Sequence, residues 1–130
     1  MTQTQRILDA ATAKSNELGI AVCIVVLDAG ANLKAFVRMD GAYLGSIDVA
    51  MKKAKSAALF ESPSEALWDF VKPGGTSPGL ELTNEVLVTF AGGLPLKATS
   101  GVTVGAVGVS GGQVSQDSEI AQAGAKAFSA

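Results

Sequence analysis

The sequence of 130 residues contains no histidine. One chain of this kind cannot build a Ser-His-Asp triad, a Cys-His dyad, or a zinc or haem iron ligated by histidine. Any proton transfer would have to use aspartate, glutamate, lysine, tyrosine or cysteine side chains, or the chain termini. The sequence contains no other pattern of metal ligands that could replace histidine, and we expect no metal site.

Cysteine is almost absent as well, because Cys23 is the only one. No disulfide can form within the chain, and Cys23 lies in the apolar run 20–27, where we expect it to be buried as a small hydrophobic side chain. The apolar runs 20–27 and 102–109 are too short to span a bilayer. Residues 1–19 lack the apolar centre of a secretion signal, so we expect a cytoplasmic location.

Aromatic residues are scarce at 5%, and the net charge is only −2, from ten basic and twelve acidic residues. The core must therefore consist mainly of valine, isoleucine, leucine and alanine. No basic stripe is present to neutralise phosphates, so we expect neither a nucleic-acid partner nor a membrane partner. The length predicts a single domain over residues 1–130.

Helices are predicted from apolar periodicity over residues 4–18, 44–60 and 115–128, with a short helix over 63–70. Thr4 is expected to cap the first helix and Gly19 to end it. The second helix should bury one stripe of side chains, comprising Leu44, Ile47, Ala50, Ala54, Ala57 and Ala58.

Strands are predicted over residues 20–27 and 33–39, joined by the turn 28–32 as an antiparallel hairpin. Further strands are predicted over 86–90, 95–99 and 102–109, after a loop at 72–84 that is rich in proline and glycine. This order predicts an α+β fold with helices packed on a mostly antiparallel sheet of about five strands.

The segment Arg38-Met39-Asp40-Gly41 is the most concentrated functional signal in the sequence. An arginine side chain can hold a carboxylate or a phosphate through two parallel hydrogen bonds. The alternative is an Arg38–Asp40 ion pair on the surface, followed by a turn that leads into the next helix.

Other charged candidates lie on the predicted helices. Lys53 lies about 60° from Ala50 around the helix axis, at the border of the buried stripe. It could bind an anion there, or it could extend its ammonium into solvent. Asp117 is on the inward stripe of the last helix, where it could also simply favour the helix dipole. The Gly111-Gly112 pair precedes that helix and could present N–H groups to an anion or form a tight turn.

Three aromatic residues, Tyr43, Trp68 and Phe70, are expected near loops. Large aromatic side chains in such positions can line the site of a flat ligand, or can form a contact between subunits.

Together these segments resemble the GlcG/HbpS-like family, which includes haem-binding proteins and the C-terminal domain of some corrinoid adenosyltransferases. The resemblance implies a profilin-like α/β/α arrangement around a five-stranded antiparallel sheet, and a homo-oligomer. It is carried by residues 26–30, 38–42, 50–57, 92–96 and 104–112, and by Asp117 and Ala121. The positions that match the family pattern are Arg38, Asp40, Gly41, Lys53, Gly111, Gly112 and Asp117.

Three functions are compatible with these observations. The first is binding of an anionic or planar small molecule, for which we expect contacts from Arg38, Met39, Gly41, Tyr43, Lys53, Gly111 and Gly112. The second is an enzyme of organic-acid metabolism, a deaminase, tautomerase or hydratase, with Arg38, Asp40, Lys53 and Asp117 as its catalytic groups. The third is an oligomer without a ligand.

The resemblance also raises the question of a tetrapyrrole cofactor. Without histidine, a haem iron would need Met39, Tyr43, Lys53 or Cys23 as its ligand. We therefore favour the absence of a cofactor over a bound haem or corrinoid.

Overall fold

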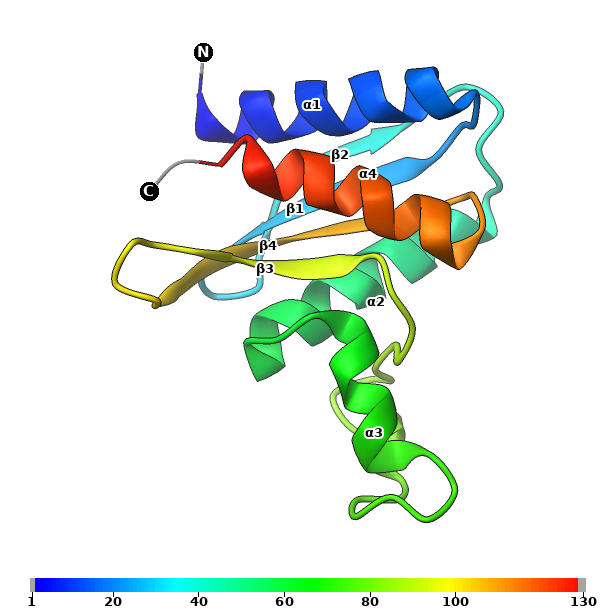
Figure 1. Cartoon of the computed structure of the whole chain (residues 1–130), viewed down its shortest axis with the longest axis vertical. Helices are drawn as coiled ribbons and strands as arrows, with labels where there is room; N and C mark the ends of the chain where they lie inside the picture. The colour runs from blue at the N-terminus through cyan, green and yellow to red at the C-terminus, as the bar shows by residue number, and fades with distance from the viewer. Residues whose placement is uncertain (1, 129–130) are drawn as a thin grey trace.

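Four strands form one antiparallel sheet with the order β2-β1-β4-β3. The computed structural model describes residues 2–128, and its strands are β1 (Cys23–Asp28), β2 (Leu33–Arg38), β3 (Gly93–Lys97) and β4 (Thr103–Ser110). Helices α1 (Gln3–Leu18) and α4 (Val114–Lys126) cover one face, and α2 (Gly45–Phe60) covers the other (Figure 1). The predicted α+β class and the three layers are confirmed.

The alternation of side chains along the central strands creates two cores. Val22, Ile24 and Val26 point toward α1 and α4, whereas Cys23 and Val25 point toward α2. The central strand β1 is therefore buried on both faces, as its uninterrupted apolar sequence predicts.

Helix α2 approaches β4 unusually closely because glycine and alanine face each other. A Cβ atom placed on Gly108 would collide with the backbone oxygen of Ala50 and would lie only 2.7 Å from the backbone nitrogen of Ala54. Small side chains on both elements thus let the helix rest directly on the strand.

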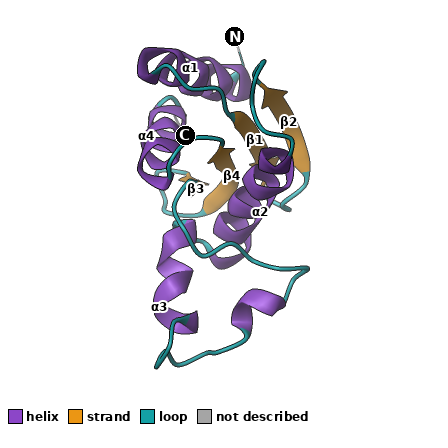
Figure 2. Cartoon of the chain, turned by 90° about the vertical axis from the view of Figure 1, so that its right-hand side faces the viewer, coloured by secondary structure: helices purple, strands orange, loops and turns teal. Residues whose placement is uncertain are grey.

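Residues 61–90 project from the layered body as an extension that we call the arm (Figure 1). The arm contains the short helices η1 (Ser64–Leu67), α3 (Trp68–Val71) and η2 (Leu80–Leu82). In the perpendicular view α3 also stands apart from the sheet, below the end of α2 (Figure 2). Several large apolar side chains of the arm are exposed, namely Trp68, Phe70, Leu82, Val86 and Phe90.

The prediction of a strand over residues 86–90 is wrong, so the sheet has four strands and not five. Val86 has a φ of 75°, and the N–H of Val88 donates to the Ser56 hydroxyl of α2 at 2.9 Å. The Phe90 carbonyl accepts from the Ser64 hydroxyl at 2.7 Å. Because side chains of α2 and η1 satisfy this backbone, the segment docks beside α2 and does not join the sheet.

Two further predictions about helices are corrected. The cap of α1 is Thr2, whose hydroxyl accepts from the Gln5 N–H at 3.1 Å, and not Thr4. Leu44 and Ile47 are exposed and not part of the buried stripe. The inward face of α2 carries alanine, serine and Lys53 instead. The short side chains fit against Gly108 of the sheet, and Lys53 lies in the space that Gly92 and Gly93 leave open.

Candidate functional site

The predicted site residues gather at one end of the sheet. Ser110 at the end of β4 pairs with Cys23 at the start of β1, and Cys23 pairs with Arg38 at the end of β2. Directly opposite residues of an antiparallel pair point to the same face, so this row faces α2. Gly111-Gly112 and the first turn of α4 follow Ser110 at the same end (Figure 1).

A buried ion pair between Lys53 and Asp117 lies at this end. Lys53 Nζ is 3.0 Å from Asp117 Oδ2, and it also donates to the Val109 carbonyl at 2.8 Å. The other carboxylate oxygen, Asp117 Oδ1, accepts from the Gly112 N–H at 2.9 Å. Lys53 is only 1% exposed and Asp117 only 2%. The pair therefore connects α2 to the start of α4 and does not reach solvent.

The surroundings of Lys53 oppose its charge and compensate it at the same time. Burial lowers the pKa of the Lys53 ammonium, and the Asp117 carboxylate counteracts part of this shift. The Phe90 ring lies 5.1 Å from Nζ, so its face adds a cation–π contact. A Cβ atom on Gly92 would come within 2.7 Å of Nζ. The Gly92-Gly93 pair thus makes room for the lysine.

The exposed part of the site is formed by the segment after β2. Arg38 and Asp40 are both exposed, and neither forms an ion pair with any other of residues 2–128. Met39 lies on the opposite face and packs against the core beneath α1 and α4. Gly41 has a φ of 90°, a conformation that favours glycine, and Tyr43 is 75% exposed.

An open groove of about 430 Å³ shares the Phe90 side chain with the buried pair. Trp68 and Phe90 are its aromatic walls, and Val114, the first residue of α4, adds a third apolar side chain. Its remaining lining residues are Glu65, Thr89 and Ala91. A volume in this range is typical of sites for small organic ligands.

The structure brings some of the predicted residues together and separates others. Lys53, Asp117 and Gly112 form one hydrogen-bonded unit. The sequence did not reveal it because helical periodicity and turn signals describe each element separately. Neither Arg38 nor Lys53 lines the groove, and their roles toward a ligand stay predictions. Trp68 was predicted to line a flat-ligand site or to form a subunit contact, whereas Phe90 was missed because it lies in the segment predicted as a strand.

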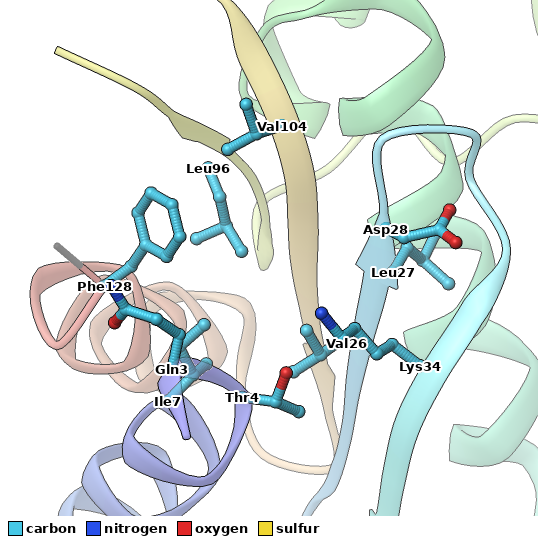
Figure 3. A pocket seen from close by; sticks show the side chains of 10 residues that line it. All are labelled: Gln3, Thr4, Ile7, Val26, Leu27, Asp28, Lys34, Leu96, Val104 and Phe128. Carbon is cyan, nitrogen blue, oxygen red and sulfur yellow. The ribbon is translucent and has the colours of Figure 1, made fainter. Parts of the chain in front are cut away.

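A second, much smaller cavity lies at the opposite end of the sheet (Figure 3). Its volume of about 50 Å³ is enough for only a few water molecules. The wall is formed by side chains from α1, all four strands or their ends, and Phe128, as Figure 3 shows. This cavity is too small for a metabolite.

Comparison with known proteins identifies the family. The model of the HbpS-like family, described as haem-degrading protein HbpS-like, matches residues 1–126. This chain belongs to the HbpS-like family. It is 37% identical over 130 residues to a 15.0 kDa protein from the dhaT–dhaS intergenic region of Citrobacter freundii, covering 99% of this chain and 91% of that protein.

Two more HbpS-like relatives carry names that refer to tetrapyrroles. The corrinoid adenosyltransferase PduO of Salmonella typhimurium is 38% identical over 115 residues, and the match covers 87% of this chain but only 34% of PduO. A crystal structure described as a PduOC:heme complex superposes with a TM-score of 0.91 at 35% identity, covering 96% of this chain and 91% of the other. This chain therefore corresponds to about a third of PduO.

The expected iron ligands can be tested against this structure. Cys23 and Lys53 are buried, and Met39 packs into the core. Tyr43 is the one member of this set that is largely exposed, and a phenolate is an established haem ligand. Of the four, only Tyr43 is exposed enough to meet the iron of an external haem, which would supply redox and ligand-binding chemistry, and it is not among the residues that line the Trp68 groove.

None of the helices within residues 2–128 has both the length and the apolar character to cross a bilayer.

Proposed function

We propose that this chain is a binding protein for a planar, mostly apolar small molecule, which lies between Trp68 and Phe90. The observation that carries the proposal is the open groove with two aromatic walls. Aromatic side chains offer flat apolar surfaces that stack on a planar ligand at little cost in conformational entropy. The haem complex of a relative with 35% identity supports a planar ligand of this kind.

The buried pair supports the proposal by holding the groove in place. Phe90 rests against Lys53 Nζ, and Lys53 is bonded to Asp117 and Val109. Val114 begins the helix whose first turn contains Asp117. Two walls of the groove are thus attached to one rigid unit, so the groove is formed before a ligand arrives.

The catalytic alternative keeps Arg38 as a carboxylate anchor, with Asp40, Lys53 and Asp117 as acid–base groups. It requires Lys53 to leave two hydrogen bonds and the Phe90 ring before it can meet a substrate. Breaking a buried ion pair costs several kcal/mol. The binding function needs no such rearrangement, and we favour it for that reason. A cytoplasmic location and a place in organic-acid metabolism stay predictions.

A homo-oligomer is the second part of the proposal. The arm projects from the body and exposes Trp68, Phe70, Leu82 and Val86. Clusters of exposed apolar side chains usually mark contact surfaces, and an identical subunit is the simplest partner for them.

Trp68 is the only tryptophan, so its fluorescence reports directly on the groove. We expect saturable quenching by iron-free protoporphyrin IX and by haem. Phe90→Ala should weaken the binding of both about tenfold through loss of one stacking wall. Phe36→Ala, which removes another exposed phenylalanine from β2, is the matched control and should bind normally.

Circular dichroism checks that each variant remains folded. Absence of saturable quenching by both porphyrins, or equal affinity of Phe90→Ala and the unmodified protein, would refute the proposed groove. Iron-free protoporphyrin separates stacking in the groove from ligation of iron by Tyr43.

A further inference from the structure

The groove between Trp68 and Phe90 has one charged lining residue, Glu65. Glu65 is exposed and takes part in none of the ion pairs formed among residues 2–128. The other lining residues are apolar, apart from the uncharged hydroxyl of Thr89. In a mostly apolar site, the few polar groups decide which ligand is accepted and how it is oriented. The lining of the groove therefore carries a negative charge and no positive one.

Local geometry places the Glu65 side chain beside the Trp68 ring. The two residues are three positions apart, and the Trp68 N–H donates to the Glu65 carbonyl at the end of the 3₁₀-helix η1. In a 3₁₀-helix, side chains at positions i and i+3 lie almost directly above each other. The carboxylate thus borders the same wall that offers its aromatic face to a ligand.

Ser64 sets the spacing between this wall and Phe90. Its hydroxyl donates to the Phe90 carbonyl at 2.7 Å and accepts from the Gly93 N–H at 3.0 Å. Ser64 is fully buried, so water does not compete for these two hydrogen bonds. The backbone positions of Glu65, Trp68 and Phe90 are therefore set before a ligand binds, which lowers the entropy that binding costs.

Two kinds of group near the groove could otherwise pair with an anion, and both are engaged. The Lys53 ammonium is buried and is bonded to Asp117. At the start of α4, the N–H groups of Gly112 and Gln113 donate to the side chains of Asp117 and Gln116. An anionic ligand would thus meet no partner of opposite charge among the residues that line the groove.

We propose that the planar ligand of this groove carries a positive charge, as a heteroaromatic cation does, and that Glu65 selects it. This inference rests on the proposed binding function of the groove. The faces of tryptophan and phenylalanine rings attract cations through their quadrupoles, and the Glu65 carboxylate adds a counter-charge. Both effects favour a cation over a neutral molecule of the same shape. The carboxylates of protoporphyrin IX would have to lie at the open side of the groove, away from Glu65.

The test uses planar compounds of the same three-ring shape and different charge, which are N-methylacridinium, acridine and anthracene carboxylate. At a slightly alkaline pH acridine is uncharged, and isothermal titration calorimetry of the full chain should give affinities in this order, with the cation tightest. Glu65→Gln should weaken the binding of N-methylacridinium about threefold, as expected for one charge pair that stays partly in water. It should strengthen the binding of anthracene carboxylate and leave acridine unchanged. Glu61→Gln removes another exposed carboxylate of the arm and is the matched control.

Phe90→Ala separates the charge selection from the groove itself, because it should weaken the binding of all three compounds. If it does so while Glu65→Gln leaves the ratio of cation to anion affinity unchanged, the selection by Glu65 is overturned and the groove stands. An anion that binds more tightly than the cation also overturns the selection. If none of the compounds binds saturably, or if Phe90→Ala changes no affinity, the groove and the selection are both overturned.

Discussion

Lys53 Nζ lies 3.0 Å from Asp117 Oδ2, although the two residues are 64 positions apart in the chain. Lys53 belongs to α2 on one face of the sheet, and Asp117 belongs to α4 on the other. The ion pair therefore joins the two outer layers at the end of the sheet where the candidate sites lie. Its loss should affect stability and binding together.

The first prediction concerns Asp117→Asn. This change leaves a buried ammonium without its counter-charge, so we expect the free energy of unfolding to fall by about 3–5 kcal/mol. Urea denaturation measures the effect. Glu119→Gln on the same helix is the control, because Glu119 is exposed and its 3.8 Å contact with Lys14 should contribute less than about 1 kcal/mol. Equal stability of the two variants would contradict a structural role for the pair.

The second prediction concerns pH and Lys53. Burial holds the Lys53 pKa in the folded protein below its ordinary value of 10.5. At a pH between the lowered pKa of folded Lys53 and its ordinary value of 10.5, the unfolded chain binds more protons than the folded protein. Raising the pH through this range therefore stabilises the folded state. We expect the unmodified protein to gain stability relative to Lys53→Met as the pH rises toward 10.5, in denaturation at several pH values. A constant difference between the two proteins would show that burial does not perturb Lys53.

The third prediction tests the close approach of α2 to β4. Gly108→Ala places a methyl group against Ala50 and Ala54, and should lower the free energy of unfolding by about 1–3 kcal/mol. Gly45→Ala is the comparison, because a Cβ atom there meets nothing within 4 Å in the first turn of α2. It should stabilise the protein by roughly 0.5–1 kcal/mol. Equal effects in thermal denaturation would argue against direct helix–strand contact.

The fourth prediction concerns iron. Tyr43 is the only tyrosine in the sequence, so ferric haem bound through it should show a tyrosinate-to-iron charge-transfer absorption. Tyr43→Phe should abolish this absorption while leaving the binding of iron-free protoporphyrin IX unchanged. Identical haem spectra in the two proteins would exclude Tyr43 as the ligand.

The fifth prediction concerns assembly. Sedimentation should show a particle larger than the 13.1 kDa chain, and Leu82→Glu in the arm should shift it toward the monomer. A buried charge without a partner strongly disfavours an apolar contact. Val102→Glu introduces the same charge at an exposed position beside β4 and should leave assembly unchanged. A monomeric unmodified protein would refute the proposed oligomer.

Local patterns in the sequence predicted most of the layered body. The end of α1 at Gly19 follows from a left-handed turn that glycine adopts easily, and its φ is 72°. The first hairpin follows from the turn residues at positions 28–32. The Asp28 N–H donates to the Asn32 carbonyl at 2.9 Å and closes this turn. Both signals depend only on neighbouring residues.

The errors arose where partners distant in the chain decide the structure. Valine is common in strands, but the Val88 N–H donates a hydrogen bond to the Ser56 hydroxyl of α2 and not to a neighbouring strand. Periodicity predicts Lys53 only at the border of the buried stripe. Its full burial depends on hydrogen bonds from its ammonium to Asp117 and to the Val109 carbonyl, and helical periodicity contains no information about these distant partners.

The strand order has a consequence for the way the chain folds. The central strand β1 lies between β2, its immediate successor, and β4, which comes near the end of the chain. During synthesis the apolar strand β1 therefore has one unpaired edge until almost the whole chain has emerged. Long-range pairing of this kind slows folding and exposes the nascent chain to aggregation. We expect the β1–β4 junction, where Cys23 meets Ser110, to close late.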